Sequence, residues 1–199
     1  MEEPRSRRSL LAAAGAVTLV AGCGGTAGPA KEPAGKKVNA PGDREVVAFA
    51  LTLEYFEADF YERLVREQLI SGRDGELVKR IADDEAAHVE ALEKTLRKYG
   101  GQLPDRPSPN FDRLLDGGPK AIIARASEIE NVGAAAYLGQ ASRIQSREVL
   151  AAALSIHAVE ARHASVLAHR AGLAFVPDGA LASPLSRDDV LSRVEPYLN

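Results

Sequence analysis

Residues Val78–Tyr99 read VKRIADDEAAHVEALEKTLRKY, and this stretch decides the fold. Its apolar residues recur at alternating steps of three and four, which is the spacing of one face of an α-helix. Glu85 and His88 fall in the middle of that face. Because burying either side chain without a partner costs several kcal/mol, the face requires a compensating charge or a metal ion.

The same pattern returns in the second half of the chain. Glu160 and His163 form a second Glu-x-x-His sequence inside an apolar stripe. A helical pattern with one glutamate on its apolar face precedes each copy: Glu54 stands 31 residues before Glu85, and Glu130 stands 30 residues before Glu160. The chain is therefore predicted to be a tandem repeat of a two-helix unit. In both units a tyrosine follows the first glutamate by seven residues, at Tyr61 and Tyr137.

This organisation predicts an all-α fold, with an antiparallel four-helix bundle over residues 44–172. The long Pro- and Gly-rich connection before Pro119 fits the crossover between two antiparallel hairpins. Residues 173–199 are predicted to form a tail with one short helix. The expected helices run from an N-cap at Asp43 to about Ile70, from there to Gly100, from Pro119 to about Ile144, from a cap at Ser146 to Gly172, and from Ser186 to Val194.

Residues 1–23 have the features of an export signal. Arg7 and Arg8 make a twin-arginine start, and the apolar run that follows is too short to span a bilayer comfortably. The sequence Val20–Cys23 resembles the lipobox of bacterial lipoprotein precursors, which implies a lipid on Cys23 and anchoring at the outer face of the cytoplasmic membrane. An ordinary secretory peptide with an incidental cysteine, a weak membrane anchor and export without the twin-arginine route remain alternatives. Residues 24–43 are predicted to be a flexible tether.

Composition narrows the function classes. The formal net charge is −3, whereas domains that bind nucleic acid are usually basic, so the composition does not indicate nucleic-acid binding. The single cysteine excludes an intramolecular disulfide and any Cys-x-x-Cys site.

The residues on the helix faces point to a metal site. A Glu and a His three residues apart lie on one helical face and can bind one ion. Four such carboxylates and two imidazoles from four helices suffice for two metals, and their donor atoms favour Fe or Mn over a structural Zn. The alternative is a metal-free bundle with buried salt bridges.

Other charged residues are weaker candidates for ligands. Glu57 and Glu128 each lie within a turn of a predicted ligand and are the residues most easily confused with one. His157 and His169 are predicted to be exposed. The charged face expected in solvent comprises Glu57, Glu62, Asp83, Asp84, Glu90 and Glu93.

Residues 45–172 resemble ferritin-like domains of the rubrerythrin and bacterioferritin superfamily, and with the tail they are most similar to bacterial ferritin-like proteins related to desiccation-associated proteins. The sequences that carry the resemblance are LEYFEADFY at 53–61, DEAAH at 84–88, ENVGAAAY at 130–137 and EARH at 160–163. The resemblance implies that the hydroxyls of Tyr61 and Tyr137 donate hydrogen bonds to carboxylates that bind the metals. The metal ligands that it implies are Glu85 and Glu160 as bridges, Glu54 and His88 on one ion, and Glu130 and His163 on the other.

Two classes of function follow from this resemblance. The first is an oxidoreductase whose Fe or Mn pair oxidises Fe(II) or reacts with O₂ or peroxide outside the cytoplasmic membrane. The chain has no rubredoxin-like cysteine module, and a lipid anchor with a short tail disfavours a storage cage. The second is a non-enzymatic structural or desiccation-protective bundle, and an envelope adaptor is a third option. A monomer and a homodimer are both open.

Overall fold

The computed structural model describes residues 41–198, so the predicted signal peptide, Cys23 and residues 24–40 of the predicted tether lie outside the described residues. Among residues 41–198 every regular element is helical, and the only extended pairing is an isolated antiparallel bridge between Pro109 and Leu198. The predicted all-α fold is confirmed. The elements are α1 (Pro41–Arg66), α2 (Gly72–Lys98), α3 (Asp112–Leu115), α4 (Pro119–Gln140), the 3₁₀ turn η1 (Ala141–Arg143), α5 (Arg147–Ala171), α6 (Arg187–Val194) and the 3₁₀ turn η2 (Glu195–Tyr197).

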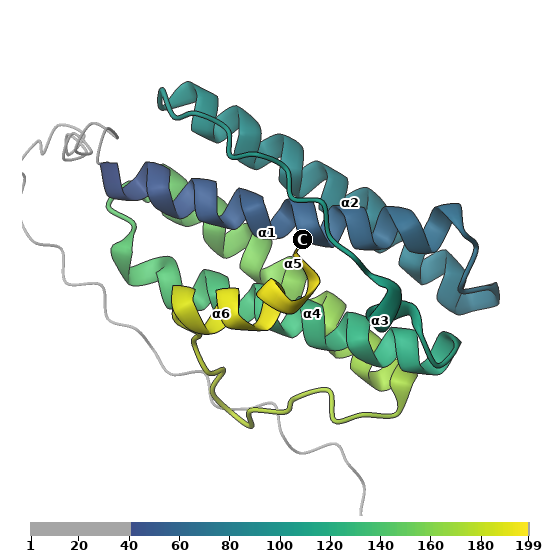
Figure 1. Cartoon of the computed structure of the whole chain (residues 1–199). Helices are drawn as coiled ribbons and strands as arrows, with labels where there is room; N and C mark the ends of the chain where they lie inside the picture. Colours follow the sequence, from purple (N-terminus) through teal and green to yellow (C-terminus); the bar gives the residue numbers. More distant parts are fainter. Residues whose placement is uncertain (1–40, 199) are drawn as a thin grey trace, which may run out of the picture. The chain divides into compact units, whose positions relative to one another are not determined.

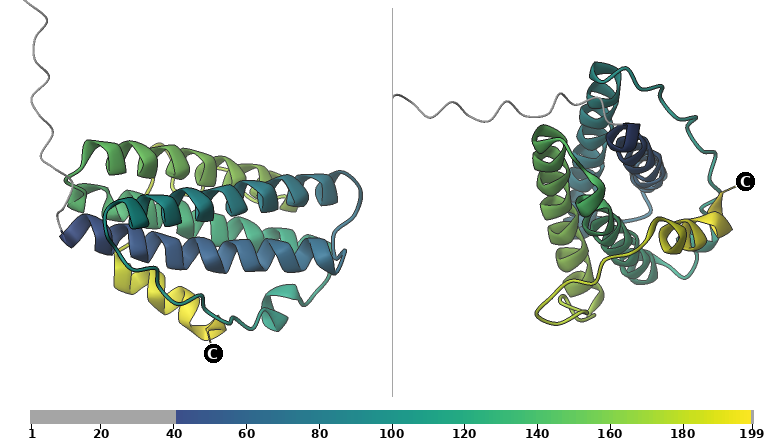
Figure 2. Two further views of the ribbon diagram at one scale, coloured as in Figure 1. Left: turned by 90° about the horizontal axis from the view of Figure 1, so that it is seen from above. Right: turned by 90° about the vertical axis from the view of Figure 1, so that its left-hand side faces the viewer.

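The four long helices form two hairpins (Figure 1, Figure 2). α1 packs along α2 and α4 packs along α5, with short turns at residues 67–71 and 144–146 that make each pair antiparallel. The long crossover, residues 99–118, joins the hairpins and carries the single-turn α3 (Figure 1). The predicted antiparallel bundle with a long crossover is therefore confirmed. None of the described helices combines the length and the apolar character needed to cross a membrane.

The starts of the first and last bundle helices are linked. Ser146 caps α5, as predicted, by accepting a hydrogen bond from the Val149 amide. Asp43 was predicted to cap its own helix, but α1 already begins at residue 41. The buried Asp43 carboxylate instead accepts hydrogen bonds from the amides of Gln145 and Ser146, at 2.7 and 2.9 Å. Asp43 therefore ties the start of α1 to the start of α5 across the bundle.

The first helix ends at Arg66, before the predicted end. Gln68 has a φ of 53°, in the left-handed region. The amides of Gln68 and Leu69 donate back to the carbonyls of Val65 and Leu64, which is the Schellman pattern of helix termination. Glycine usually occupies the left-handed position of this motif. Because a glutamine occupies it here, the sequence does not indicate that the helix ends at this point.

The remaining helix boundaries agree closely with the prediction. Pro119 stands in the first turn of α4, which gives way to η1 after Gln140. α5 ends just before Gly172. Ser186 and Asp189 form a reciprocal capping box at the start of α6.

The C-terminal segment packs on the outside of α4 (Figure 1). Val190 and Val194 of α6 are buried in the same apolar cluster as the phenylalanines of α1. The Leu185 amide donates to the Ala135 carbonyl at 3.0 Å. A Cβ at Gly139 would lie 1.9 Å from the Leu185 carbonyl oxygen, so the tail rests directly on the backbone of α4.

Two apolar clusters form the core, and along α2 and α5 they flank a charged layer. In α2, Val78 belongs to the first cluster and Leu92 to the second. In α5, Ile156 belongs to the second cluster and Leu167 to the first. Both Glu-x-x-His sequences lie between these positions on their helices. Because an apolar cluster closes each side of the layer, its ionisable groups are buried away from bulk water.

Candidate metal centre

The six predicted ligands converge in the charged layer from four different helices. The four glutamates are 0% exposed, and neither histidine is more than 8% exposed. The regular spacing along each helix directs these side chains to the same level of the bundle. They are Glu54 on α1, Glu85 and His88 on α2, Glu130 on α4, and Glu160 and His163 on α5.

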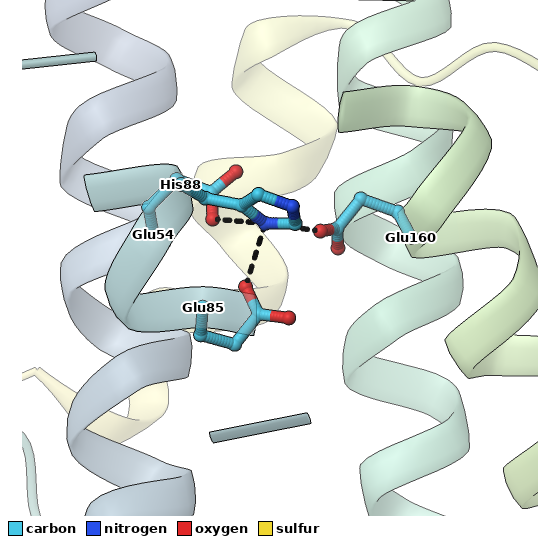
Figure 3. Close-up of side chains that lie close together, drawn as sticks. All are labelled: Glu54, Glu85, His88 and Glu160. Atoms are coloured by element: carbon cyan, nitrogen blue, oxygen red, sulfur yellow. Dashed lines mark hydrogen bonds and ion pairs between the residues drawn. The ribbon is translucent and has the colours of Figure 1, made fainter. Parts of the chain in front are cut away.

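His88 is surrounded by carboxylates from three helices (Figure 3). Its Nδ1 lies 3.2 Å from Glu85 Oε2 on its own helix. The same nitrogen lies 3.3 Å from Glu54 Oε2 and 3.1 Å from Glu160 Oε1. One ring nitrogen therefore faces three acidic groups at once.

His163 has a similar inner side and a different outer side. Its Nδ1 lies 3.1 Å from both Glu85 Oε1 and Glu130 Oε2. Its Nε2 lies 3.1 Å from Asp84 Oδ2, across the bundle on α2. Asp84 was predicted to belong to the solvated face. Its side chain is 56% exposed, but its carboxylate contacts the outer nitrogen of His163 and so fixes the orientation of the ring.

The ligand atoms fall into two overlapping groups, in each of which all atoms lie within 4.8 Å of one another. Glu85 and Glu160 belong to both groups. These are the two residues that the family resemblance assigns to bridging positions. The ligand roles themselves stay a prediction. The groups are Glu54, Glu85, His88 and Glu160, and Glu85, Glu130, Glu160 and His163.

The imidazoles are strongly basic in this setting. Burial alone would lower the pKa of His88, but hydrogen bonds to Glu160, Glu54 and Glu85 outweigh it and raise that pKa to about 12. For His163 the carboxylates of Glu130 and Glu85 likewise overcome burial and raise the pKa to about 10.

One of the five buried glutamates has a lowered pKa, and the other four have raised pKa values. Burial raises the pKa of Glu54 to about 7, and the pKa values of Glu57, Glu130 and Glu160 also rise because of burial. Burial would raise the pKa of Glu85 too, but hydrogen bonds from both imidazoles lower it to about 2. Without additional positive charge, the layer therefore holds protons on its carboxylates.

The two tyrosines predicted to donate to the carboxylates are both buried, but their contacts differ. The Tyr137 hydroxyl donates to Glu54 Oε1 at 2.5 Å, from the opposite hairpin. The Tyr61 hydroxyl is buried near Glu130, but it has no acceptor in good hydrogen-bond geometry. Burial and then the nearby charge of Glu130 hold the pKa of Tyr61 well above its ordinary value.

Glu57 corrects the prediction of a solvated position. It is 3% exposed, and its Oε2 is buried without a partner. Glu57 lies three residues after Glu54, the spacing of Glu85 and His88, and that spacing was the signal available in the sequence. The electrostatic influence of Glu160, Glu54, Glu85 and Glu130 adds to burial in raising the pKa of Glu57, so it belongs to the same charged layer.

The chemistry of the layer fits divalent or trivalent metal ions. Five buried glutamates face two imidazoles, so the acidic groups outnumber the basic ones. Glu160 Oε2 and Glu57 Oε2 have neither a hydrogen bond nor an ion pair. Buried charges of this kind are paired or bind metals, and oxygen with imidazole nitrogen suits Fe and Mn.

The two other histidines lie outside the layer. His169 is exposed, as predicted. His157 is half-buried, contrary to the prediction, and its Nδ1 lies 2.9 Å from the Ala134 carbonyl oxygen. A hydrogen bond between helices accounts for this position, which involves none of the buried glutamates.

Comparison with known proteins places this architecture in a family. No curated protein gives a significant match to the chain. The family model described as a ferritin-like domain matches residues 42–172. Except for the first residue of α1, that range takes in the four long helices, and it includes every residue of both ligand groups. The chain therefore belongs to the family of ferritin-like domains.

Proposed function

We propose that the buried cluster binds a pair of Fe or Mn ions and that the loaded protein oxidises Fe(II) or reacts with O₂ or peroxide in stress defence. The pair of ligand groups that share Glu85 and Glu160 supports this proposal. Two ions that share carboxylates at the centre of a four-helix bundle are typical of ferritin-like di-metal proteins.

Each of the named residues has a distinct part in this proposal. Glu85 and Glu160 hold both ions, because they alone belong to both groups. Tyr137 orients Glu54 through its hydroxyl, and Asp84 orients His163 through the outer ring nitrogen. The terminal ligands are Glu54 and His88 for one ion and Glu130 and His163 for the other.

When bound, the metal pair supplies the electron-transfer chemistry that protein side chains lack. The chain itself supplies position and seclusion. The apolar clusters on either side of the layer limit the access of water, and a dry site strengthens every electrostatic contact within it.

Elemental analysis of the protein purified from its own host tests the first half of the proposal. We expect about two Fe or Mn ions per chain, as in other bundles of this type. Consumption of O₂ or peroxide after addition of Fe(II) tests the second half. A preparation that retains no metal after reconstitution with Fe(II) or Mn(II) would refute the proposal.

Metal without turnover would instead favour the non-enzymatic alternative, a structural or desiccation-protective bundle. The contacts between the imidazoles and the glutamates join all four helices, and such a structural role supports this alternative. Turnover above that of an equal concentration of free Fe(II) separates the two functions.

We propose in addition that the protein is exported and anchored by a lipid on Cys23. The sequence Val20–Cys23 supports this location. We expect Cys23→Ala to move the protein from the membrane fraction to the soluble fraction. Persistent membrane association of the variant would exclude the lipid anchor.

A further inference from the structure

Glu57 is a buried carboxylate for which the six-ligand scheme has no use. Its side chain is 3% exposed, and its Oε2 has no hydrogen-bond partner. It also lines a cavity of about 410 Å³ between α1, α4 and the C-terminal segment. A buried acceptor without a partner is destabilising, and more so when it is charged. The protein chain therefore leaves one oxygen of this buried carboxylate without a partner.

The helix that faces Glu57 has a glycine where a side chain would interfere. A Cβ at Gly133 would meet Glu57 Oε1 at 2.7 Å and Glu160 Oε2 at 2.8 Å. Gly133 lies in the middle of α4, where glycine is less favourable than alanine. The space beside Gly133 is therefore shared by Glu57 and by a residue of both ligand groups.

The internal repeat makes Glu57 and Gly133 equivalent positions. Glu57 follows Glu54 by three residues on α1, and Gly133 follows Glu130 by three residues on α4. One half of the repeat therefore carries a carboxylate at the position where the other half carries none. Glu57 from α1 approaches the space that the glycine on α4 leaves open.

We propose that Glu57 is a seventh protein ligand of the metal centre, contributed by α1 and admitted by Gly133. This inference rests on the proposed function, since it requires that the layer binds metal. Glu57 belongs to neither four-residue group, but its Oε1 and Glu160 Oε2 both border the space beside Gly133. It joins them by rotation of its own side chain, for which Gly133 leaves the room.

A fifth carboxylate also changes the charge balance. Four ionised carboxylates balance two divalent ions, and a fifth leaves the site one charge more negative. Opposite charges attract more strongly in a buried site than in water. The centre with Glu57 therefore favours trivalent over divalent ions, more strongly than a centre without it.

Titration of the metal-free full-length chain with Co(II) tests the inference. We expect two bound ions in wild type and in Glu57→Gln, with the affinity for one ion about tenfold or more weaker in the variant. Glu57→Asp keeps the charge but is one methylene shorter, so we expect it to weaken binding as Glu57→Gln does. Glu128→Gln is the matched control, because Glu128 is exposed and lines the same cavity, and it should titrate as wild type does.

The possible outcomes separate the inference from the proposed function. A wild-type chain that binds no metal overturns both. Wild-type affinity in Glu57→Gln overturns the inference alone. Wild-type affinity in Glu57→Asp does so too, because it would show that the negative charge is sufficient without direct contact between the side chain and the metal. Circular dichroism establishes that each variant is folded before it is titrated.

The oxidation state of bound iron gives a second readout. We expect the Fe(III)/Fe(II) midpoint potential to be higher in Glu57→Gln than in wild type, because loss of one negative charge disfavours Fe(III). An equal or lower potential in the variant would contradict the charge argument and with it the inference.

Discussion

The α1–α2 hairpin and the α4–α5 hairpin carry the same ligand pattern in different surroundings. His163 in the second hairpin has a carboxylate, Asp84, on its outer nitrogen. Asp84 immediately precedes Glu85, and the equivalent residue before Glu160 is Val159, which cannot do the same for His88. An internal repeat thus fixes which donors meet but leaves their supporting contacts unequal.

The tyrosines and the neighbours of the first glutamates differ in the same way. Tyr137 donates to the glutamate of the opposite hairpin, whereas the Tyr61 hydroxyl lies near Glu130 without a well-formed hydrogen bond. Glu57 in the first hairpin corresponds to Gly133 in the second. The two groups of ligand atoms are therefore chemically inequivalent, although the sequence motifs that build them match.

Removal of both imidazoles should have the largest effect on both halves. We expect His88→Ala with His163→Ala to abolish metal binding while leaving helicity largely intact, because each ligand group loses its only nitrogen donor. Metal titration followed by circular dichroism checks this. The exposed His169→Ala is the control, and a double variant that binds as much metal as wild type would show that the ligand assignment is wrong.

Asp84→Asn should weaken one half more than the other. The amide cannot accept from His163 with the strength of a carboxylate, and loss of such a contact reduces metal affinity about 10–100-fold. We expect the loss in one of the two binding steps only, measured by calorimetry. The neighbouring exposed Asp83→Asn should bind as wild type does, and equal loss in both steps would show that the halves do not differ at this position.

The chelator-treated protein should become less stable as the pH rises, because most of its buried carboxylates are more stable in the protonated form. In chelator-treated protein, the raised pKa of Glu54 means that stability falls as pH rises from about 4.5 to about 7. The raised pKa values of His88 and His163 provide stability that is complete below 6.5 and is lost as pH rises through about 10 and about 12. Glu85, with a pKa of about 2, acts in the opposite direction only below about 4.5.

We therefore expect the Tm of chelated protein to be highest near pH 5 and to fall toward pH 9. Metal should raise the Tm more at higher pH, because its ligands must lose protons to bind. A chelated protein whose Tm rises between pH 5 and pH 8 would contradict the assigned pKa directions.

The tyrosines should give the smallest difference between the halves. Tyr137→Phe removes a hydrogen bond to a buried glutamate and should lower the free energy of unfolding by about 1–3 kcal/mol. Tyr61→Phe removes a hydroxyl that has no well-formed hydrogen bond, so it should cost less or stabilise the chelated protein. Urea denaturation measures both, and a larger loss for Tyr61→Phe would reverse the expected order.

The sequence was sufficient for the helices and the main donors because both depend on local spacing. A step of three on a helix fixes that Glu85 and His88 share a face, whatever the neighbouring helices do. Asp84 could not be assigned in this way, since it meets His163 only through the packing of α2 against α5. Asp43 was misassigned for the same reason, because its partners lie on another helix.

Other errors arose where a residue departs from the usual preference for its position. Gln68 takes a backbone conformation that usually belongs to glycine, so the end of α1 was placed too late. Glu57 has the same sequence spacing as a ligand, but charged residues are so often exposed that the pattern alone favoured solvent. Burial and the proximity of Gly133, which only the folded chain displays, decide its position.

The contact of the tail with Gly139 bears on where a truncated version of this domain should end. The family match stops at residue 172, yet the hydrophobic interior extends to Val194. A fragment trimmed to the homology boundary would lose α6 and leave phenylalanine side chains of α1 without their cover. A shortened version designed on sequence similarity alone would therefore tend to aggregate, whereas one that ends after Leu198 keeps its outer layer.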